Sequence, residues 1–209
     1  MHVKTVFILL LILTGCANTT WPGMAGNGRI QAKSNLTGFV ETGRYNKWFR
    51  DYTQFHLPSS ISPRWPKAVA LAESNLKVNA KSSAGALGLM QMLPSTWAWI
   101  APEPWKSAGP MDPEAAIWVG CYFLRWNWNR IIGPDTPQRK AMSNSAYNSG
   151  IGWLIKARNN CHTPCDRNIW YENVENCLVT RIDAQIENKN YVKRIKKFEQ
   201  QLLILNEFI

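Results

Sequence analysis

Residues 67–73 read KAVALAE, a run of five apolar residues between a lysine and a glutamate. Alanine and leucine favour helices, and Pro63 and Pro66 stand where proline is tolerated, at the start of a helix. The run therefore predicts a helix of about two to three turns near Glu73. Because the residues one turn before Glu73 are apolar, we expect its carboxyl to emerge beside an apolar face.

The same helical pattern continues toward the C-terminus. Asp112 and Pro113 form a typical N-cap and first-turn pair, and apolar residues then recur at helical spacing: Ile117, Cys121, Leu124 and Trp128. A last helix is expected from near Asp183, where a second set of apolar residues repeats at intervals of three and four: Ile195, Phe198, Leu202 and Leu205. Alternation with a period of two is scarce, so the body is predicted to be mostly α.

Composition limits the classes of protein that need consideration. The chain has 209 residues, of which 45% are hydrophobic, which is enough for a core and excludes a wholly disordered protein. Its net charge of +10 favours polyanionic surroundings, which include nucleic acid, phospholipid and anionic cell-wall polymer. The basic residues are scattered rather than gathered in a stripe with aromatics, so a nucleic-acid partner is not expected.

The first residues have the layout of an export signal. Lys4 is followed by eight apolar residues at 6–13, a run too short to span a bilayer. The sequence LTGC at residues 13–16 resembles the lipobox of bacterial lipoproteins, in which the cysteine is lipidated and becomes the mature N-terminus. An ordinary cysteine in a cleaved signal is the alternative reading of Cys16. The lipobox implies a bacterial envelope protein, and the absence of Asp at position 17 favours the outer membrane, facing the periplasm.

This reading divides the chain into three parts. Residues 1–15 are predicted to be a lipoprotein signal peptide. Residues 16–60 are predicted to be a lipidated N-terminus with a flexible tether and an extension, because residues 17 to about 40 are rich in Gly, Asn, Thr and Ser. Residues 61–209 then form the functional domain.

An exported protein meets an oxidising environment. Besides Cys16, four cysteines remain, and we expect two disulfides among them in any of three connectivities: Cys121, Cys161, Cys165 and Cys177. A zinc site that adds His162 to three of these cysteines is the alternative. The spacing of these residues matches no strong zinc pattern, and a zinc site would leave Cys121 without a partner. Structural disulfides are therefore favoured and no metal is predicted.

Glu73 is the one acid that follows an unbroken apolar run. Burial beside apolar groups raises the pKa of a carboxyl group, as general acid catalysis at neutral pH requires. An ordinary ion pair with Lys77 is the alternative for this residue. Two further segments favour the catalytic reading: SSAGALGLMQ at 82–91, whose glycines allow close backbone approach, and SAYNSG at 145–150, which sets a phenol beside an amide.

Together these segments resemble the lytic transglycosylases related to goose-type lysozyme, which cleave peptidoglycan glycan strands. The resemblance rests on Glu73-Ser74, on GALGLMQ at 85–91, on AYNSG at 146–150, and on Glu187 followed by Tyr191-Val192. It covers about residues 63 to 200, and four motifs in the family's order form a strong signal. The chain departs from the family at Met92-Leu93 and Ile151, and residues 159–178 form an insertion without a match.

The resemblance implies a lysozyme-like fold with a substrate groove and a mechanism that needs one carboxyl and no cofactor or metal. Glu73 would protonate the oxygen between N-acetylmuramic acid and N-acetylglucosamine, and then take a proton from the C6 hydroxyl of the muramoyl residue. The product is a 1,6-anhydro end. The cleft would be lined by four polar residues that orient the sugar: Ser82, Gln91, Tyr147 and Asn148.

Several residues carry secondary expectations. By resemblance, Glu187 is expected to lie buried and to support the structure with Tyr191, whereas a general-base role for Glu187 would make the protein a hydrolase. Trp153 is the preferred groove aromatic, and Trp118 and Trp128 are assigned to packing. Three others could stack on sugar rings or join the core: Trp97, Trp99 and Trp105.

Two alternatives share the fold and the glycan. A hydrolytic lysozyme (muramidase) would use the same substrate, and a non-catalytic peptidoglycan-binding module would keep the groove without needing Glu73. The expected partners are peptidoglycan strands and a membrane reached through the lipid at Cys16. A partner from the cell-wall or secretion machinery is expected to be of unknown identity.

Overall fold

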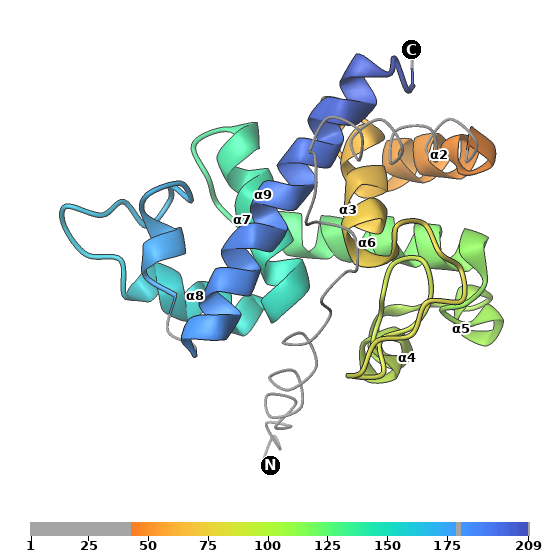
Figure 1. Ribbon diagram of the computed structural model, residues 1–209, viewed down its shortest axis with the longest axis horizontal. Helices are drawn as coiled ribbons and strands as arrows, with labels where there is room; N and C mark the ends of the chain where they lie inside the picture. The colour runs from red at the N-terminus through yellow and green to blue at the C-terminus, as the bar shows by residue number, and fades with distance from the viewer. Residues whose placement is uncertain (1–42, 179–180, 209) are drawn as a thin grey trace, which may run out of the picture.

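The computed structural model of the protein describes residues 43–178 and 181–208, so the predicted signal, the Cys16 lipidation site and the tether at 17 to about 40 lie outside the described residues. The described part is mostly helical, as predicted, with no strand beyond isolated bridges. Its main helices, labelled in Figure 1, are α2 (Asn46–His56), α3 (Arg64–Ser74), α4 (Pro94–Ile100), α5 (Trp105–Ala108), α6 (Pro113–Arg130), α7 (Thr136–Ser149), α8 (Ile151–Asn159) and α9 (Ile182–Ile204). Two short 3-10 turns occur at Gly43–Tyr45 and Val174–Asn176.

Helix α3 is the one that KAVALAE predicts, and it lies at the centre of the fold. Residues 68–71 are almost completely inaccessible to solvent. The helix ends because Asn75 adopts a left-handed conformation with φ of 53°, a position that asparagine tolerates better than most residues. Glu73 therefore stands in the last turn, at the C-terminal end of the most buried helix.

The long helix α9 crosses the molecule and packs along α3, as Figure 1 shows. It also contacts α7, while α6 packs against α2 and α7. The predicted N-cap of α6 is confirmed, since the Asp112 side chain accepts a 2.8 Å hydrogen bond from the amide of Ala115. None of the described helices is both long enough and apolar enough to cross a bilayer.

Residues before position 61 also belong to this core. Tyr45, Phe49 and Leu57 are buried in the same cluster as Trp65 of α3. The expected N-terminal extension, residues 16–60, thus contributes α2 to the packed body.

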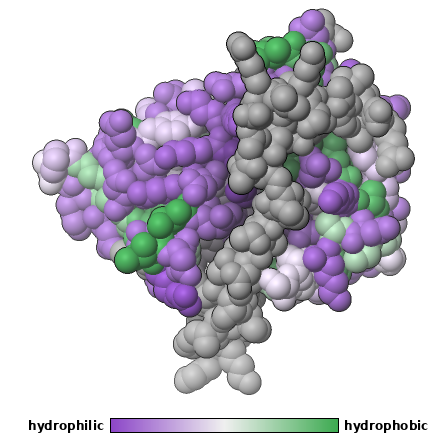
Figure 2. All heavy atoms as spheres, in the orientation of Figure 1, coloured by the Kyte–Doolittle hydropathy of each residue, from purple (hydrophilic) through white to green (hydrophobic). Residues whose placement is uncertain are grey.

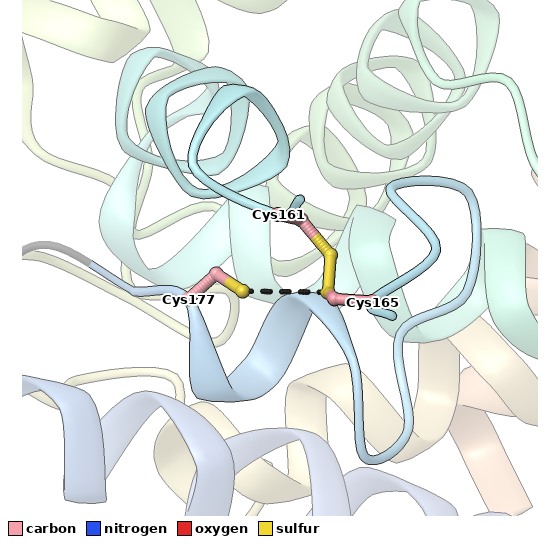
Figure 3. A group of neighbouring side chains, drawn as sticks. All are labelled: Cys161, Cys165 and Cys177. Atoms are coloured by element: carbon pink, nitrogen blue, oxygen red, sulfur yellow. Dashed lines mark hydrogen bonds between the residues drawn. A yellow bond between two sulfur atoms is a disulfide. The ribbon is translucent and has the colours of Figure 1, made fainter. Parts of the chain in front are cut away.

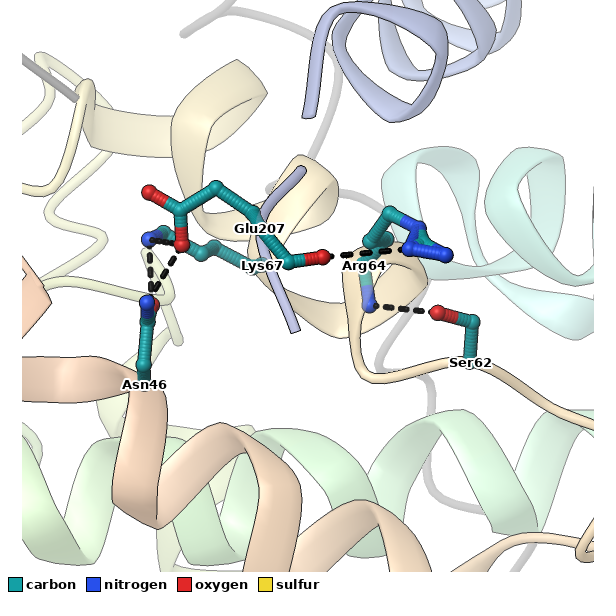
Figure 4. A network of polar contacts seen from close by, with 5 residues as sticks. All are labelled: Asn46, Ser62, Arg64, Lys67 and Glu207. Carbon is teal, nitrogen blue, oxygen red and sulfur yellow. Dashed lines mark hydrogen bonds and ion pairs between the residues drawn. The ribbon is translucent and has the colours of Figure 1, made fainter. Parts of the chain in front are cut away.

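A buried ion pair ties the end of the described chain to the first turn of α3 (Figure 4). The ammonium of Lys67, which has no exposed side-chain surface, lies 3.0 Å from the Glu207 carboxylate and also donates to Asn46. Arg64 adds a 3.1 Å hydrogen bond to the Glu207 carbonyl oxygen. Burial lowers the pKa of Lys67, which the nearby Glu207 carboxylate partly offsets. The two ends of the described chain are therefore joined at the base of α3.

The expectation of two disulfides is wrong for the described residues, which contain one, between Cys161 and Cys165 (Figure 3). Cys121 is buried in α6 as a free thiol, and burial raises its pKa to about 12, so that little reactive thiolate forms. Cys177 is also free, with its sulfur 3.4 Å from the sulfur of Cys165. The three clustered sulfurs lie within 4.8 Å of one another, but two of them are joined and cannot act as thiolate ligands for zinc.

The insertion at 159–178 has a small core of its own. Trp170 and Val174 are fully buried and pack with Leu154 of α8 and Met142 of α7. The amide of Trp170 donates a 2.9 Å hydrogen bond to the side chain of Gln138. These contacts attach the insertion to the outer side of α7 and α8.

Candidate active site

A pocket of about 200 Å³ opens at the end of α3. Its walls come from α3, from the loop that follows it, and from α6, α7 and α9. It is lined by several residues that the sequence motifs predict to be functional: Glu73, Ser82, Gln91, Tyr147, Asn148, Glu187 and Tyr191. Segments far apart in the sequence thus meet at one concave site.

Glu73 is only partly accessible within this pocket. Desolvation by burial raises the pKa of its carboxyl to about 7, and the nearby Glu187 carboxylate adds to the rise. A hydrogen bond from Tyr191 and the charge of Arg194 oppose the shift without cancelling it. Because the C-terminal end of a helix also disfavours a negative charge, α3 supports the protonated form. Glu73 can therefore hold a proton near neutral pH, as a general acid must.

Tyr191 fixes the orientation of this carboxyl group. Its hydroxyl, carried by α9, donates a 2.5 Å hydrogen bond to Oε1 of Glu73. A carboxylic acid that accepts a bond on one oxygen carries its proton on the other, so the acidic hydrogen is assigned to Oε2. Burial and the Glu73 charge raise the pKa of Tyr191 well above its ordinary value, so the phenol remains a donor.

Ser74 joins the end of α3 to the glycine-rich loop, because its hydroxyl donates a 2.8 Å hydrogen bond to the carbonyl oxygen of Leu89. Gly88, with φ of +74°, brings the loop against the neighbouring segment, and a Cβ atom there would lie 1.8 Å from the carbonyl oxygen of Pro110. The close backbone approach that the sequence predicts for this loop is therefore found at Gly88.

The same loop presents Ser82 and Gln91. The Gln91 amide nitrogen donates to the carbonyl oxygens of Gly88 (2.9 Å) and Ala80 (3.1 Å), and its backbone φ is 47°. Its side-chain oxygen has no partner among the described residues and can accept a bond from a ligand. The Ser82 hydroxyl oxygen accepts a 3.0 Å hydrogen bond from the amide of Ala86 and retains its own hydrogen as a donor.

Tyr147 and Asn148 enter the pocket from the last turns of α7. The Tyr147 hydroxyl donates a 2.9 Å hydrogen bond to the Met90 carbonyl oxygen, so this phenol also holds the glycine-rich loop. The Asn148 side-chain oxygen accepts a 3.0 Å bond from buried Asn188 of α9. The amide nitrogen of Asn148 has no hydrogen-bond partner in the described part of the chain. Because the oxygen of the same amide is held by Asn188, this nitrogen has a fixed orientation and can donate to a ligand.

Glu187 differs from its expectation of burial, since about a third of its side chain is exposed. It lines the pocket and accepts a 3.1 Å hydrogen bond from the guanidinium of Arg194, about two turns further along α9. The pairing balances the charge of this second carboxylate beside Glu73.

The tryptophans divide between core and surface. Trp97 and Trp128 are buried, and Trp118 packs between His56 and Trp105, so the packing roles expected for Trp118 and Trp128 agree with the structure. Trp153 does not line the pocket, and its ring lies under the ammonium of Lys156 at 4.6 Å.

A row of aromatic rings leads out of the pocket instead. The ring of Phe123 lies 5.1 Å from Tyr147 and 6.0 Å from Trp126, and Trp126 lies 5.0 Å from Trp99. Trp99 is 57% exposed and so can stack on a sugar ring. The sequence motifs did not indicate Phe123 or Arg194 as pocket residues. Each lies three positions after a buried residue of its own helix, Gly120 and Tyr191 respectively, which is the signal that could have found them.

Comparison with known proteins agrees with this geometry. The model of the Transglycosylase SLT domain family matches residues 56–169. The chain is 32% identical over 118 residues to a membrane-bound lytic murein transglycosylase F of Marinobacter nauticus, covering 55% of this chain and 22% of the relative. It is 30% identical over 119 residues to the soluble lytic murein transglycosylase of Escherichia coli K12, covering 53% of this chain and 17% of the relative.

Solved structures support the fold. The 70 kDa soluble lytic transglycosylase of Escherichia coli superposes with a TM-score of 0.55 at 22% identity, over 78% of this chain and 25% of the other. The chain thus spans about a sixth to a quarter of the length of the proteins it matches. Because the family match covers more than half of the chain and includes Glu73, the glycine-rich loop and the Tyr147 segment, this protein belongs to the Transglycosylase SLT domain family.

Proposed function

We propose that the chain is a peptidoglycan lytic transglycosylase, which cleaves the β-1,4 bond between N-acetylmuramic acid and N-acetylglucosamine. The observation that carries this proposal is the Glu73 carboxyl group, whose pKa is about 7 in a pocket lined by all of the polar residues expected to hold the sugar. The relatives named as lytic murein transglycosylases support the same chemistry.

In the first step, Glu73 acts as general acid. Its proton, on Oε2, passes to the glycosidic oxygen as the bond to C1 of the muramoyl residue breaks. Tyr191 keeps Oε1 occupied with a hydrogen bond, so the proton-bearing oxygen alone is presented to the substrate. The positive charge that develops at C1 is relieved by the substrate's own acetamido oxygen.

In the second step, the same group acts as general base. The Glu73 carboxylate, now stabilised by the Tyr191 hydroxyl and the charge of Arg194, takes the proton of the C6 hydroxyl. That oxygen attacks C1 and closes the 1,6-anhydro ring without consuming water. The step restores the protonated acid, which a pKa of about 7 favours at neutral pH.

Ser82, Gln91 and Asn148 supply the polar groups that position the sugar. They offer a hydroxyl donor, an amide oxygen acceptor and an amide nitrogen donor, respectively. Such a set matches an acetamido group and neighbouring hydroxyls, and fixed orientation accounts for much of the rate of such reactions. Tyr147 supports this arrangement by holding the loop at Met90.

A hydrolytic muramidase is the second candidate, because a second carboxylate, Glu187, lines the same pocket. As general base, it would need to activate a water on the far face of the sugar. Its carboxylate is already engaged in an ion pair with Arg194, which favours a supporting role. A non-catalytic binding module would have no use for a raised Glu73 pKa.

Mass analysis of digested cell wall separates these candidates. Purified peptidoglycan sacculi are incubated with the wild-type chain, with Glu73→Gln and with Glu187→Gln, and the soluble fragments are weighed. We expect 1,6-anhydro products, lighter by one water than reducing ends, from the wild type and from Glu187→Gln, and none from Glu73→Gln. Reducing-end products would establish a hydrolase. Sacculi left unchanged by the wild-type chain would favour the non-catalytic binding module.

We further propose that the protein acts in the bacterial cell envelope, anchored by a lipid at Cys16 to the outer membrane on its periplasmic side. The support is the LTGC sequence behind a short apolar run. Cys16→Ser should release the protein from the membrane fraction at moderate salt. Failure of palmitate labelling in the wild type would argue against the lipid.

A further inference from the structure

The solvent-facing side of α9 carries an unusual number of apolar residues. Of the nine large hydrophobic side chains that are exposed among the described residues, four belong to this helix: Ile182 (75%), Ile186 (55%), Leu203 (54%) and Ile204 (76%). They lie in two pairs, one at each end of the helix, and Figure 2 shows apolar patches near both ends of α9. Exposed apolar residues gathered on one helix indicate a surface that meets a partner.

Lysines occupy the middle of the same side. Lys193, Lys196 and Lys197 are exposed, and Lys189 is partly exposed. At roughly 100° per residue, all four lysines and both apolar pairs fall within a sector of roughly 120°. No carboxylate of α9 lies in that sector, and Figure 2 shows a hydrophilic band between the apolar patches. We call this sector the outer face of α9.

A hollow of about 360 Å³ adjoins the outer face, between α9 and α7. Three cations line it, Arg64, Lys140 and Lys196, against one carboxylate, Glu199, which is paired with Lys140. The Lys196 ammonium lies 4.9 Å from the ring of Tyr171. The hollow therefore has an excess of positive charge, and Leu203 supplies an apolar edge.

We propose that the outer face of α9 and the adjoining hollow bind the surface of an anionic phospholipid bilayer. A helix lies in a membrane interface when apolar side chains can enter the acyl boundary while lysines contact headgroup phosphates. The two apolar pairs and the lysines between them provide that combination, and the hollow accepts one phosphate headgroup. The charge complementarity is what selects an anionic bilayer over a neutral one.

This contact would set the direction of the active site. Glu187, Tyr191 and Arg194 leave α9 roughly 140° away from the centre of the outer face, at the pocket. A bilayer on the outer face therefore leaves the pocket open on the side away from the lipid. Besides the proposed lipid at Cys16, this surface would be a second attachment that also orients the protein.

The test uses the full chain carrying Cys16→Ser, which has no lipid. Binding is measured by co-sedimentation with vesicles of phosphatidylethanolamine and phosphatidylglycerol, and with phosphatidylcholine vesicles. The outer face is altered by Lys193→Glu, Lys196→Glu and Lys197→Glu together. The matched control reverses three exposed cations on α5 and α6: Lys106→Glu, Arg125→Glu and Arg130→Glu. Any contribution of residues 1–15 is common to all of these proteins.

We expect the outer-face triple variant to lose at least about 100-fold in partitioning to anionic vesicles, since each lysine near such a surface contributes roughly fivefold and each new glutamate is repelled. The control triple variant should change by less than about threefold, and both should keep the wild-type melting temperature and turnover. Ile186→Asn with Ile204→Asn should weaken the binding that persists at high salt. In an acetylation footprint, anionic vesicles should protect Lys193, Lys196 and Lys197 but not Lys106.

Other results would overturn the proposal. Equal losses in the two triple variants, or equal binding to phosphatidylcholine, would show that net charge alone is responsible. Protection of Lys196 by inorganic phosphate without vesicles would assign the hollow to a free anion. Concentration-dependent dimerisation abolished by the outer-face variant would assign the surface to a second copy, and loss of binding to sacculi but not to vesicles would assign it to the cell wall.

Discussion

The hydroxyl of Tyr191 and the carboxyl of Glu73 are joined by a 2.5 Å hydrogen bond between α9 and the end of α3. This bond favours the charged form of Glu73, yet burial prevails and the pKa stays at about 7. Desolvation therefore keeps Glu73 protonated for the proposed reaction, and the hydrogen bond from Tyr191 limits how far its pKa rises.

Tyr191→Phe removes the donor without changing the packing. We expect the pKa of Glu73 to rise, so that the decline of kcat on the alkaline side moves to higher pH. Turnover at pH 6 should fall about tenfold, because a bond that orients the acid contributes about 1–1.5 kcal/mol. A pH–rate profile on soluble glycan checks this, and an unmoved alkaline limb would show that the hydrogen bond does not act on Glu73.

Glu187 and Arg194 act on Glu73 in opposite directions. The Glu187 carboxylate raises the pKa of Glu73 and the Arg194 guanidinium lowers it. Glu187→Gln should therefore shift the alkaline limb to lower pH, and Arg194→Gln should shift it to higher pH. The two variants control for each other, since each breaks the same ion pair. Shifts of the same sign would mean that the alkaline limb of the pH–rate profile responds to disruption of the pocket and not to the charge beside Glu73.

Glu73 should also make stability depend on pH. Its pKa is raised from 4.5 to about 7 in the folded chain, so between these values the folded state binds more protons than the unfolded state. The resulting contribution is fully present below about pH 4.5 and is lost as the pH rises through 7. Glu73→Gln removes this loss and should raise the free energy of unfolding at pH 8 by about 1–3 kcal/mol. Urea unfolding at pH 5 and pH 8 measures it, and a difference that is equal at the two pH values would contradict the assignment.

The Lys67–Glu207 pair is suited to a double-mutant cycle. Glu207→Gln leaves the buried Lys67 ammonium without its carboxylate and should cost about 3 kcal/mol. Lys67→Met with Glu207→Gln removes both charges and should recover most of that loss. The exposed pair Lys47–Asp51, with 78% and 42% of its side chains accessible, is the control, and Asp51→Asn should change stability little. An additive cycle would mean that the two charges do not interact.

The arrangement of the three clustered cysteines predicts that Cys165 can form a disulfide with Cys177 when Cys161 is replaced. In Cys161→Ser, the Cys165 sulfur remains 3.4 Å from that of Cys177, and we expect these two to form a disulfide under the same oxidising conditions. Mass mapping of unreduced tryptic peptides identifies the linkage. Cys177→Ser, as control, should keep the bond between Cys161 and Cys165. If Cys165 and Cys177 both remain open to alkylation in Cys161→Ser, the prediction is wrong.

Much of the fold could be predicted from local sequence patterns. The apolar run before Glu73, the Asp112 N-cap and the spacing of apolar residues in α9 each act within a few residues, and each gave a helix that the structure contains. The motif residues also meet in one pocket, which the resemblance implied.

Features that depend on contacts between residues distant in sequence could not be predicted as well. The choice among four cysteines depends on which sulfurs the fold brings together, and burial of Cys121 in α6 removed it from the set. Glu187 was expected to be buried, but its pairing with Arg194 lets it remain partly exposed. Trp153 follows the Tyr147 motif in sequence, yet α8 turns away after Gly150, and Phe123 of α6 stands at the pocket instead.

The buried ion pair between Lys67 and Glu207 has a consequence for the order in which the protein folds. The first turn of α3 gains its counter-charge from a residue 140 positions later, and α9 supplies one wall of the pocket. The pocket around Glu73 is therefore complete only after α9 and Glu207 have packed against α3, which requires nearly the whole chain. With the proposed export signal, this last folding step would follow transfer out of the cytoplasm, so the proposed activity would arise only in the cell envelope.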